Sequence, residues 1–91
     1  MNQQTFVTEP GHEITVEQKL QDAPYGWTGS VSVKGVINRD GNVEQSEDPE
    51  FYGVYYVLKD GFEMWAEDFK SLELANQFAD ALQDSVMAKA G

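Results

Sequence analysis

The sequence has no cysteine and only one histidine among its 91 residues. Without cysteine the chain forms no disulfides and no thiolate metal site, and His12 alone excludes a histidine-rich metal cage. We expect His12 to be an ordinary surface residue. No apolar run approaches the roughly 18 to 20 residues that a membrane-spanning helix needs. Residues 1–7 also lack the basic stretch and apolar run of a secretory signal, so we expect a cytoplasmic location.

The usual devices for binding cations and nucleotides are also missing. Placing Gly41 at the sixth position of a calcium-binding loop puts Val36 at the first position, where a carboxylate is required. No glycine-rich loop precedes a helix, so the usual means of binding a nucleotide phosphate is absent. No pair of carboxylates is marked by a pocket that would perturb its pKa. We therefore expect no enzymatic activity, no catalytic residue, no cofactor and no metal.

The chain is strongly acidic, with 16 acids against 6 bases and a net charge of -10. This balance disfavours direct contact with nucleic acid or an anionic membrane surface, and it favours a basic protein partner. Nine of the acids and a single base, Lys59, lie between residues 40 and 68. Such a concentrated negative surface is able to occupy a basic groove in place of nucleic acid. The alternative is that the acids only maintain solubility and protect sheet edges.

Four segments have the alternation or the composition of β-strands: residues 12–20, 30–38, 51–58 and 62–69. Residues 1–11 end in Pro10-Gly11 and are predicted to form a flexible N-terminal arm before a single α+β domain over residues 12–91. Asp40-Gly41 is typical of a tight turn after the second strand. Residues 42–50 then form a short edge extension followed by an acidic loop.

A helix is predicted from Leu72 to Lys89. Ser71 is a favourable N-cap, and Glu73 lies in the first turn, where the helix dipole favours a carboxylate. Apolar residues recur at steps of three and four along one side of this segment, namely Ala75, Phe78, Ala79, Leu82 and Val86. The predicted fold is therefore a four-stranded antiparallel meander covered on one face by the C-terminal helix.

A two-residue turn at Asp60-Gly61 would fix the pairing of the last two strands. It pairs Val57 with Met64, and it places on an uncovered face Tyr52, Tyr56, Glu63, Trp65 and Glu67. Rings and carboxylates on one exposed face are typical of a recognition surface. In the alternative assignment this same face is the core side, with the glutamates at its rim and with these residues buried: Val54, Tyr56, Leu58, Trp65 and Phe69. A third residue in the turn would also shift the pairing.

These patterns predict a non-enzymatic acidic domain that binds a basic protein surface, and more specifically an inhibitor that occupies a partner's nucleic-acid-binding surface. The predicted binding residues are Glu44, Glu47, Asp48, Glu50, Tyr52, Tyr56, Glu63, Trp65 and Glu67. The alternative function is that of a small structural or regulatory subunit. Such a subunit would form a homodimer or dock into a larger assembly through the uncovered aromatic sheet face.

Overall fold

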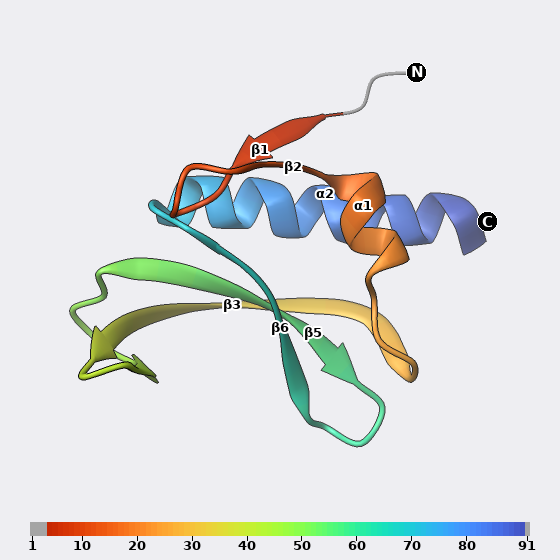
Figure 1. Cartoon of the computed structure of the whole chain (residues 1–91). Helices are drawn as coiled ribbons and strands as arrows, with labels where there is room; N and C mark the ends of the chain where they lie inside the picture. Colours follow the sequence, from red (N-terminus) through yellow and green to blue (C-terminus); the bar gives the residue numbers. More distant parts are fainter. Residues whose placement is uncertain (1–3, 91) are drawn as a thin grey trace.

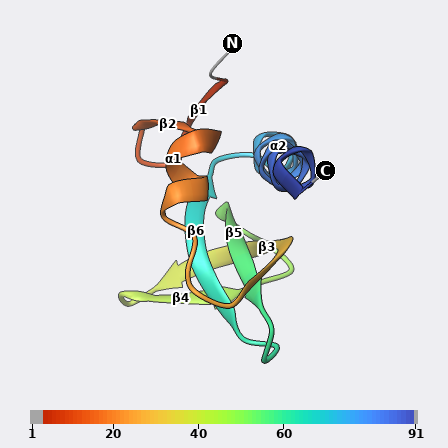
Figure 2. The same ribbon diagram turned by 90° about the vertical axis from the view of Figure 1, so that its right-hand side faces the viewer.

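Figure 1 shows the computed structural model, which describes residues 4–90 and the side chains as far as Val86. The elements in chain order are β1 (Thr5–Val7), β2 (Glu13–Thr15), α1 (Val16–Gln21), β3 (Trp27–Arg39), β4 (Asn42–Gln45), β5 (Phe51–Leu58), β6 (Glu63–Phe69) and α2 (Leu72–Ala90). β1 pairs with β2, and the other four strands form an antiparallel sheet in the order β4-β3-β5-β6. Helix α2 lies along one face of that sheet, with α1 beside it on the same side (Figures 1 and 2).

The prediction of an α+β fold is confirmed, with a four-stranded antiparallel sheet and a C-terminal helix packed on it. The meander order is wrong, because the sheet takes β4 as its fourth strand and not the segment 12–20. β3 is long enough to pair with two strands, so Val36 lies between Gln45 of β4 and Phe51 of β5. The predicted turn at Asp40-Gly41 is present, and both residues have the positive φ values, 51° and 87°, of such a turn.

The predicted strand over residues 12–20 is correct only for its first part. Thr15 ends β2 and caps α1, since its hydroxyl oxygen accepts a hydrogen bond of 3.1 Å from the Gln18 backbone N–H. Val16 and Leu20 are four residues apart, so the helix directs both toward the core. The same two residues also fit an alternating pattern, which explains the wrong prediction.

The N-terminal segment is not a flexible arm in the part that the structure describes. Phe6 is only 4% exposed. Its ring packs edge-on against those of Phe69 and Phe78, with centroids 6.4 and 5.3 Å away. Thr8 is also buried, and its hydroxyl oxygen accepts a hydrogen bond from the His12 backbone N–H. Residues 1–3 of the predicted arm lie outside the described residues.

Helix α2 forms as its periodicity predicts. The Ser71 hydroxyl oxygen accepts a hydrogen bond of 3.1 Å from the Leu74 backbone N–H, as expected of an N-cap. The helix continues through Lys89, whose side chain lies outside the described side chains. The core cluster between this helix, the sheet and the N-terminal elements consists of Phe6, Val16, Val54, Tyr56, Ala66, Phe69, Ala75, Phe78, Ala79 and Leu82.

The β5–β6 hairpin differs from the prediction in register. The Leu58 N–H donates to the Phe62 carbonyl at 2.8 Å, so three residues form the loop, and Val57 pairs with Glu63 in place of Met64. Ala66 is an extra residue that forms a β-bulge. The bulge restores the predicted pair of Val54 with Glu67. Between the bulge and the hairpin loop, each residue of β6 pairs with the β5 residue one position before its predicted partner. Trp65 therefore lies opposite Tyr55 and not opposite Tyr56.

Candidate functional site

Three of the predicted binding residues, Tyr52, Tyr56 and Glu67, lie on the covered face, which is the side of the sheet that carries α1 and α2. Their prediction as part of an uncovered face is wrong. Tyr56 is 3% exposed and Glu67 is 9% exposed. Tyr52 is half-buried and packs against the core cluster. The alternative assignment, with the core on this side, is correct for Val54, Tyr56 and Phe69. It is wrong for Trp65, which is exposed, and for Glu67, which is buried and does not lie at the rim.

The polar groups of Tyr56 and Glu67 are engaged in holding α1 against the sheet. The Tyr56 hydroxyl donates to the Lys19 carbonyl at 2.6 Å. The Lys19 ammonium lies 3.2 Å from the Glu67 carboxylate and donates to the Ala66 carbonyl at 2.9 Å. Burial, with smaller contributions from Asp22 and Glu67, raises the pKa of Tyr56 to about 12. These contacts give Tyr56 and Glu67 a structural role.

Four predicted residues form a separate group at the opposite edge of the sheet, on β4 and in the loop that leads to β5. We call this group the acidic edge, and it comprises Glu44, Glu47, Asp48 and Glu50, all exposed. Figure 2 shows β4 at the side of the sheet away from both helices. Arg39 lies 3.8 Å from Glu44, and the Glu50 carboxylate accepts a hydrogen bond from the Asn38 N–H. The structure thus brings these four carboxylates together, apart from the aromatic residues with which they were predicted to act.

The remaining two residues, Glu63 and Trp65, lie on the face of the sheet turned away from the helices. We call this surface the open face, and its side chains on β3, β5 and β6 include Ser32, Lys34, Tyr55, Val57, Glu63, Trp65 and Asp68. Because β6 is an edge strand, the Trp65 ring also comes within 5.7 Å of the Lys19 ammonium of α1. Ser32 and Lys34 both donate hydrogen bonds to the Glu63 carboxylate. The Lys34 ammonium also lies 5.6 Å from the centroid of the Tyr55 ring. Glu63 is therefore held by two neighbours from β3.

A second contact on the open face joins Trp65 to Asp68. The Trp65 indole N–H donates to the Asp68 carboxylate at 2.9 Å. Burial raises the pKa of Asp68, the Trp65 hydrogen bond opposes this shift, and the charges of Glu67 and Glu9 add to it. Trp65 itself is 55% exposed. The site thus combines an exposed ring with a partly buried carboxylate.

Gly53 makes room for the aromatic part of the open face. A Cβ atom at this position would lie 2.8 Å from the ring and hydroxyl of Tyr55, so the Tyr55 ring covers the backbone of Gly53. Gly53 pairs with Lys34 on one side and with Asp68 on the other. The Tyr55 pKa is raised by burial and by the Asp68 charge, and Lys34 opposes that shift.

Lys34, Tyr55 and Asp68 also belong to this face and were not predicted from the sequence. They were missed because the helices cover the face of Val54 and Tyr56 and leave the opposite face, with Lys34, Tyr55 and Asp68, open. The loop shift and the bulge at Ala66 then bring Glu63 and Trp65 onto that same face. One signal was present, because an isolated glycine within a strand marks a close approach of another group to the backbone. Gly53 in the run Phe51 to Leu58 is such a glycine, and the group that approaches it is Tyr55.

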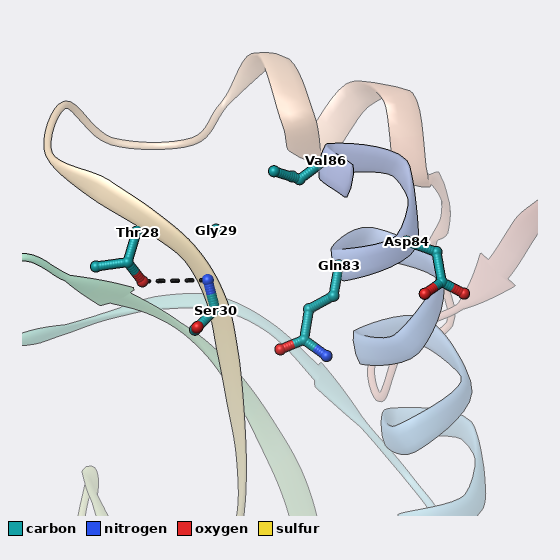
Figure 3. A pocket seen from close by; sticks show the side chains of 6 residues that line it. All are labelled: Thr28, Gly29, Ser30, Gln83, Asp84 and Val86. Carbon is teal, nitrogen blue, oxygen red and sulfur yellow. Dashed lines mark hydrogen bonds between the residues drawn. The ribbon is translucent and has the colours of Figure 1, made fainter. Parts of the chain in front are cut away.

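A shallow pocket of about 390 Å³ lies between the start of β3 and α2, and Figure 3 shows its lining residues. Gln83 points from α2 toward β3, and its side-chain oxygen accepts a hydrogen bond of 2.9 Å from the Val31 N–H. The Thr28 hydroxyl donates to the Val57 carbonyl and accepts from the Ser30 N–H. These polar groups stabilise the irregular start of β3, so we assign the pocket no ligand.

Comparison with models of protein families, with curated proteins and with solved structures finds no match for this chain. Within residues 4–90 no helix combines the length and the apolar character needed to cross a membrane. Among the described residues no group of three or more His, Asp or Glu side chains is arranged to hold a metal ion. The candidate sites are therefore the acidic edge and the open face.

Proposed function

We propose that this chain is a non-enzymatic domain that binds a basic surface of a partner protein. The observation that carries the proposal is the acidic edge, where four exposed carboxylates follow one another within seven residues. Among the described side chains a single base, Arg39, lies within salt-bridge distance of these four, at 3.8 Å from Glu44. Their negative charge therefore faces solvent largely uncompensated. Such a surface accelerates encounter with basic grooves and selects against acidic partners.

The more specific form of the proposal is that the partner is a nucleic-acid-binding protein, which this domain inhibits by occupying its basic surface. The net charge of -10 supports this form, because it gives the domain the sign of charge that such a surface binds. In this form DNA or RNA and the domain compete for the same groups of the partner.

The test is retention of the partner by an acidic-edge variant with the substitutions Glu44→Gln, Glu47→Gln, Asp48→Asn and Glu50→Gln. Glu50→Gln keeps a side-chain oxygen for the Asn38 N–H. A matched control removes the same number of charges from exposed positions elsewhere, with Glu13→Gln, Glu17→Gln, Asp80→Asn and Asp84→Asn. Each immobilised protein is incubated with lysate of the source cell and eluted in steps of rising salt, and the eluate is identified by mass spectrometry.

We expect the unmodified domain and the control to retain the same basic protein, and the acidic-edge variant to lose it at low salt. Screening shortens the reach of exposed charges from about 10 Å at 0.1 M salt to about 3 Å at 1 M, so elution should be complete within this range. Added DNA or RNA should displace the partner if the inhibitor form is correct. Equal retention by the two variants would rule out the acidic edge as the binding surface.

A second candidate function is favoured by the apolar side chains along the free edge of the sheet. At the start of β6 and in the loop before it, Phe62, Met64 and Trp65 are 71%, 48% and 55% exposed. A structural or regulatory subunit would use this edge to form a homodimer or to dock into an assembly. A homodimer formed in this way should persist at about 0.5 M salt, where contacts between exposed charges are screened. Sedimentation equilibrium at low and high salt distinguishes the two functions.

A further inference from the structure

The open face contains a carboxylate whose charge the described part of the chain does not balance. The salt bridges among the described side chains join Lys19 to Glu67, Lys34 to Glu63 and Arg39 to Glu44, and none of them includes Asp68. One oxygen of the Asp68 carboxylate accepts a hydrogen bond from the Trp65 indole N–H. The nearby charges that act on it, those of Glu67 and Glu9, are also negative. A cation from outside would therefore meet an attractive potential at Asp68.

Two aromatic rings lie next to this carboxylate, and both already contact cations of the chain itself. Tyr55 and Trp65 are direct cross-strand partners on β5 and β6. The Lys34 ammonium lies 5.6 Å from the Tyr55 ring and the Lys19 ammonium 5.7 Å from the Trp65 ring. Both lysines are neutralised by their own glutamates. More than half of the Trp65 surface nevertheless remains exposed.

We propose that the open face binds an arginine side chain of the partner protein, which stacks on Trp65 and donates to Asp68. This inference rests on the proposed function, and it adds the residue type that the partner presents. A guanidinium group suits the site better than an ammonium group, because it is planar, stacks on aromatic faces and donates from several N–H groups in a fixed fork. Tryptophan, tyrosine and arginine are also the residues most enriched at the energetic centres of protein interfaces.

The net charge of the chain favours this occupant over a second copy of the domain. Two copies would each bring a charge of -10 to the contact, whereas an arginine-rich segment brings the opposite sign. The other carboxylate of the open face, that of Glu63, is paired with Lys34, so among the described side chains of this face Asp68 is the one whose charge attracts an approaching basic segment.

The test compares a hexa-arginine peptide with a hexalysine peptide of the same charge, using the whole domain and ¹H–¹⁵N NMR. The chain contains two tryptophans, and each gives one indole N–H resonance. The Trp65 indole N–H donates to Asp68, whereas that of Trp27 donates to the Ser30 carbonyl at 2.7 Å. The two resonances therefore report separately on the open face and on the start of β3.

We expect the Trp65 resonance to shift with hexa-arginine at a concentration about fivefold lower than with hexalysine, because a guanidinium stacks on Trp65 and donates two N–H groups to the Asp68 carboxylate at the same time, whereas the charge attraction is shared by both peptides. The Trp27 resonance should move little with either peptide. Equal apparent affinities for the two peptides in the unmodified domain would overturn the inference, and so would the absence of a Trp65 shift. Neither result depends on a variant that has to fold.

Two variants then locate the preference. Asp68→Asn keeps a side-chain oxygen for the Trp65 indole but removes the charge, and it should reduce the preference for arginine to nearly none. Asp48→Asn removes one charge from the acidic edge and should weaken both peptides equally. A preference that survives Asp68→Asn contradicts the inference. The proposed function is tested independently, because it fails only if the acidic-edge variant retains the partner.

Discussion

The two faces of the sheet carry one lysine–glutamate pair each, and the pairs differ in what surrounds them. On the covered face, Lys19 and Glu67 lie 3.2 Å apart with their side chains 14% and 11% exposed. On the open face, the side chains of Lys34 and Glu63 are 35% and 27% exposed. Each lysine lies near an aromatic ring, Trp65 for Lys19 and Tyr55 for Lys34. Both pairs thus consist of a lysine, a glutamate and a nearby aromatic ring, and they differ in the exposure of their side chains.

This difference separates a pair that holds the fold together from a pair at the surface. Lys19 is also bonded to the Ala66 carbonyl, and its own carbonyl accepts the Tyr56 hydroxyl, so the covered pair connects α1 to β5 and β6. The open pair connects neighbouring strands at the surface, where water competes for the same groups. We infer that the covered pair contributes more to the stability of the fold than the open pair does.

The largest effect is expected from removing a ring of the covered face. Phe78 is fully buried in the core cluster, and Phe78→Ala should reduce the free energy of unfolding by about 3 to 5 kcal/mol. Trp65→Ala on the open face should cost less than about 1 kcal/mol, since the ring is more than half exposed. Urea unfolding followed by circular dichroism measures both values. A larger loss for Trp65→Ala would mean that the open face is part of the core.

The same chemical change in the two glutamates should give the second largest difference. Glu67→Gln leaves the Lys19 charge without its partner, at a cost of about 2 to 3 kcal/mol, because both side chains retain little contact with water. Glu63→Gln should cost below about 1 kcal/mol, as is typical of exposed pairs. The two variants are compared by urea unfolding at neutral pH. Equal losses would refute the distinction between a structural pair and a surface pair.

Burial at Tyr56 gives a smaller effect with a defined pH dependence. Tyr56→Phe leaves the Lys19 carbonyl without its donor and should cost about 1 to 1.5 kcal/mol. Burial raises the Tyr56 pKa from 10.0 to about 12, so the native state retains a proton that the unfolded chain releases. The protonated Tyr56 hydroxyl therefore makes its full contribution to the free energy of unfolding below pH 10, and this contribution is lost as the pH rises toward 12. Urea midpoints of the two proteins against pH should therefore converge in this range, and parallel curves would contradict the assignment.

The regular elements were predictable because their patterns are long and unambiguous. The prediction for residues 51–58 matches β5, and helix α2 differs from its prediction by one residue at its end. The apolar pattern of Ile14, Val16 and Leu20 was too short to distinguish a strand from a helix. The chain becomes helical after Thr15, where the Thr15 side chain caps the first turn of α1. Phe6 was assigned to an arm because a three-residue strand has no measurable period.

The candidate site was less predictable, because it depends on register. One additional loop residue and the bulge at Ala66 transfer Trp65 to the face opposite Tyr56. Local sequence does not encode either feature, since a loop of two residues and a loop of three both accept Asp60-Gly61. The acidic edge was predictable, because exposed acids in a loop remain exposed whatever the register. The separation of the acidic edge from the aromatic residues was not predictable, because it depends on the order of the strands, which places β4 and β6 at opposite edges of the sheet.

The smallest effects on the free energy of unfolding are expected from Glu63 and Asp68, the two carboxylates of the open face. Their pKa values are shifted in opposite directions, so the two effects have opposite signs. The hydrogen bond from Lys34 lowers the pKa of Glu63 below 4.5, so its contribution to stability is present above this pH and is lost in acid. Burial raises the pKa of Asp68 above 3.8, so ionised Asp68 disfavours the native state at neutral pH and protonation relieves this cost.

Glu63→Gln should therefore be less stable than the unmodified protein at pH 7, and Asp68→Asn should be as stable or slightly more stable. Both differences should shrink as the pH falls through the acid range, where the carboxylates are protonated in native and unfolded states alike. Urea unfolding at pH 7 and in acid checks the signs. A loss of stability in Asp68→Asn at pH 7 would show that the Trp65 contact stabilises the fold, and the open face would then lose its distinction from the covered face. The opposite result, a gain of stability in Asp68→Asn, would show that the ionised Asp68 is costly to the isolated domain, and the arginine contact proposed above would offset that cost.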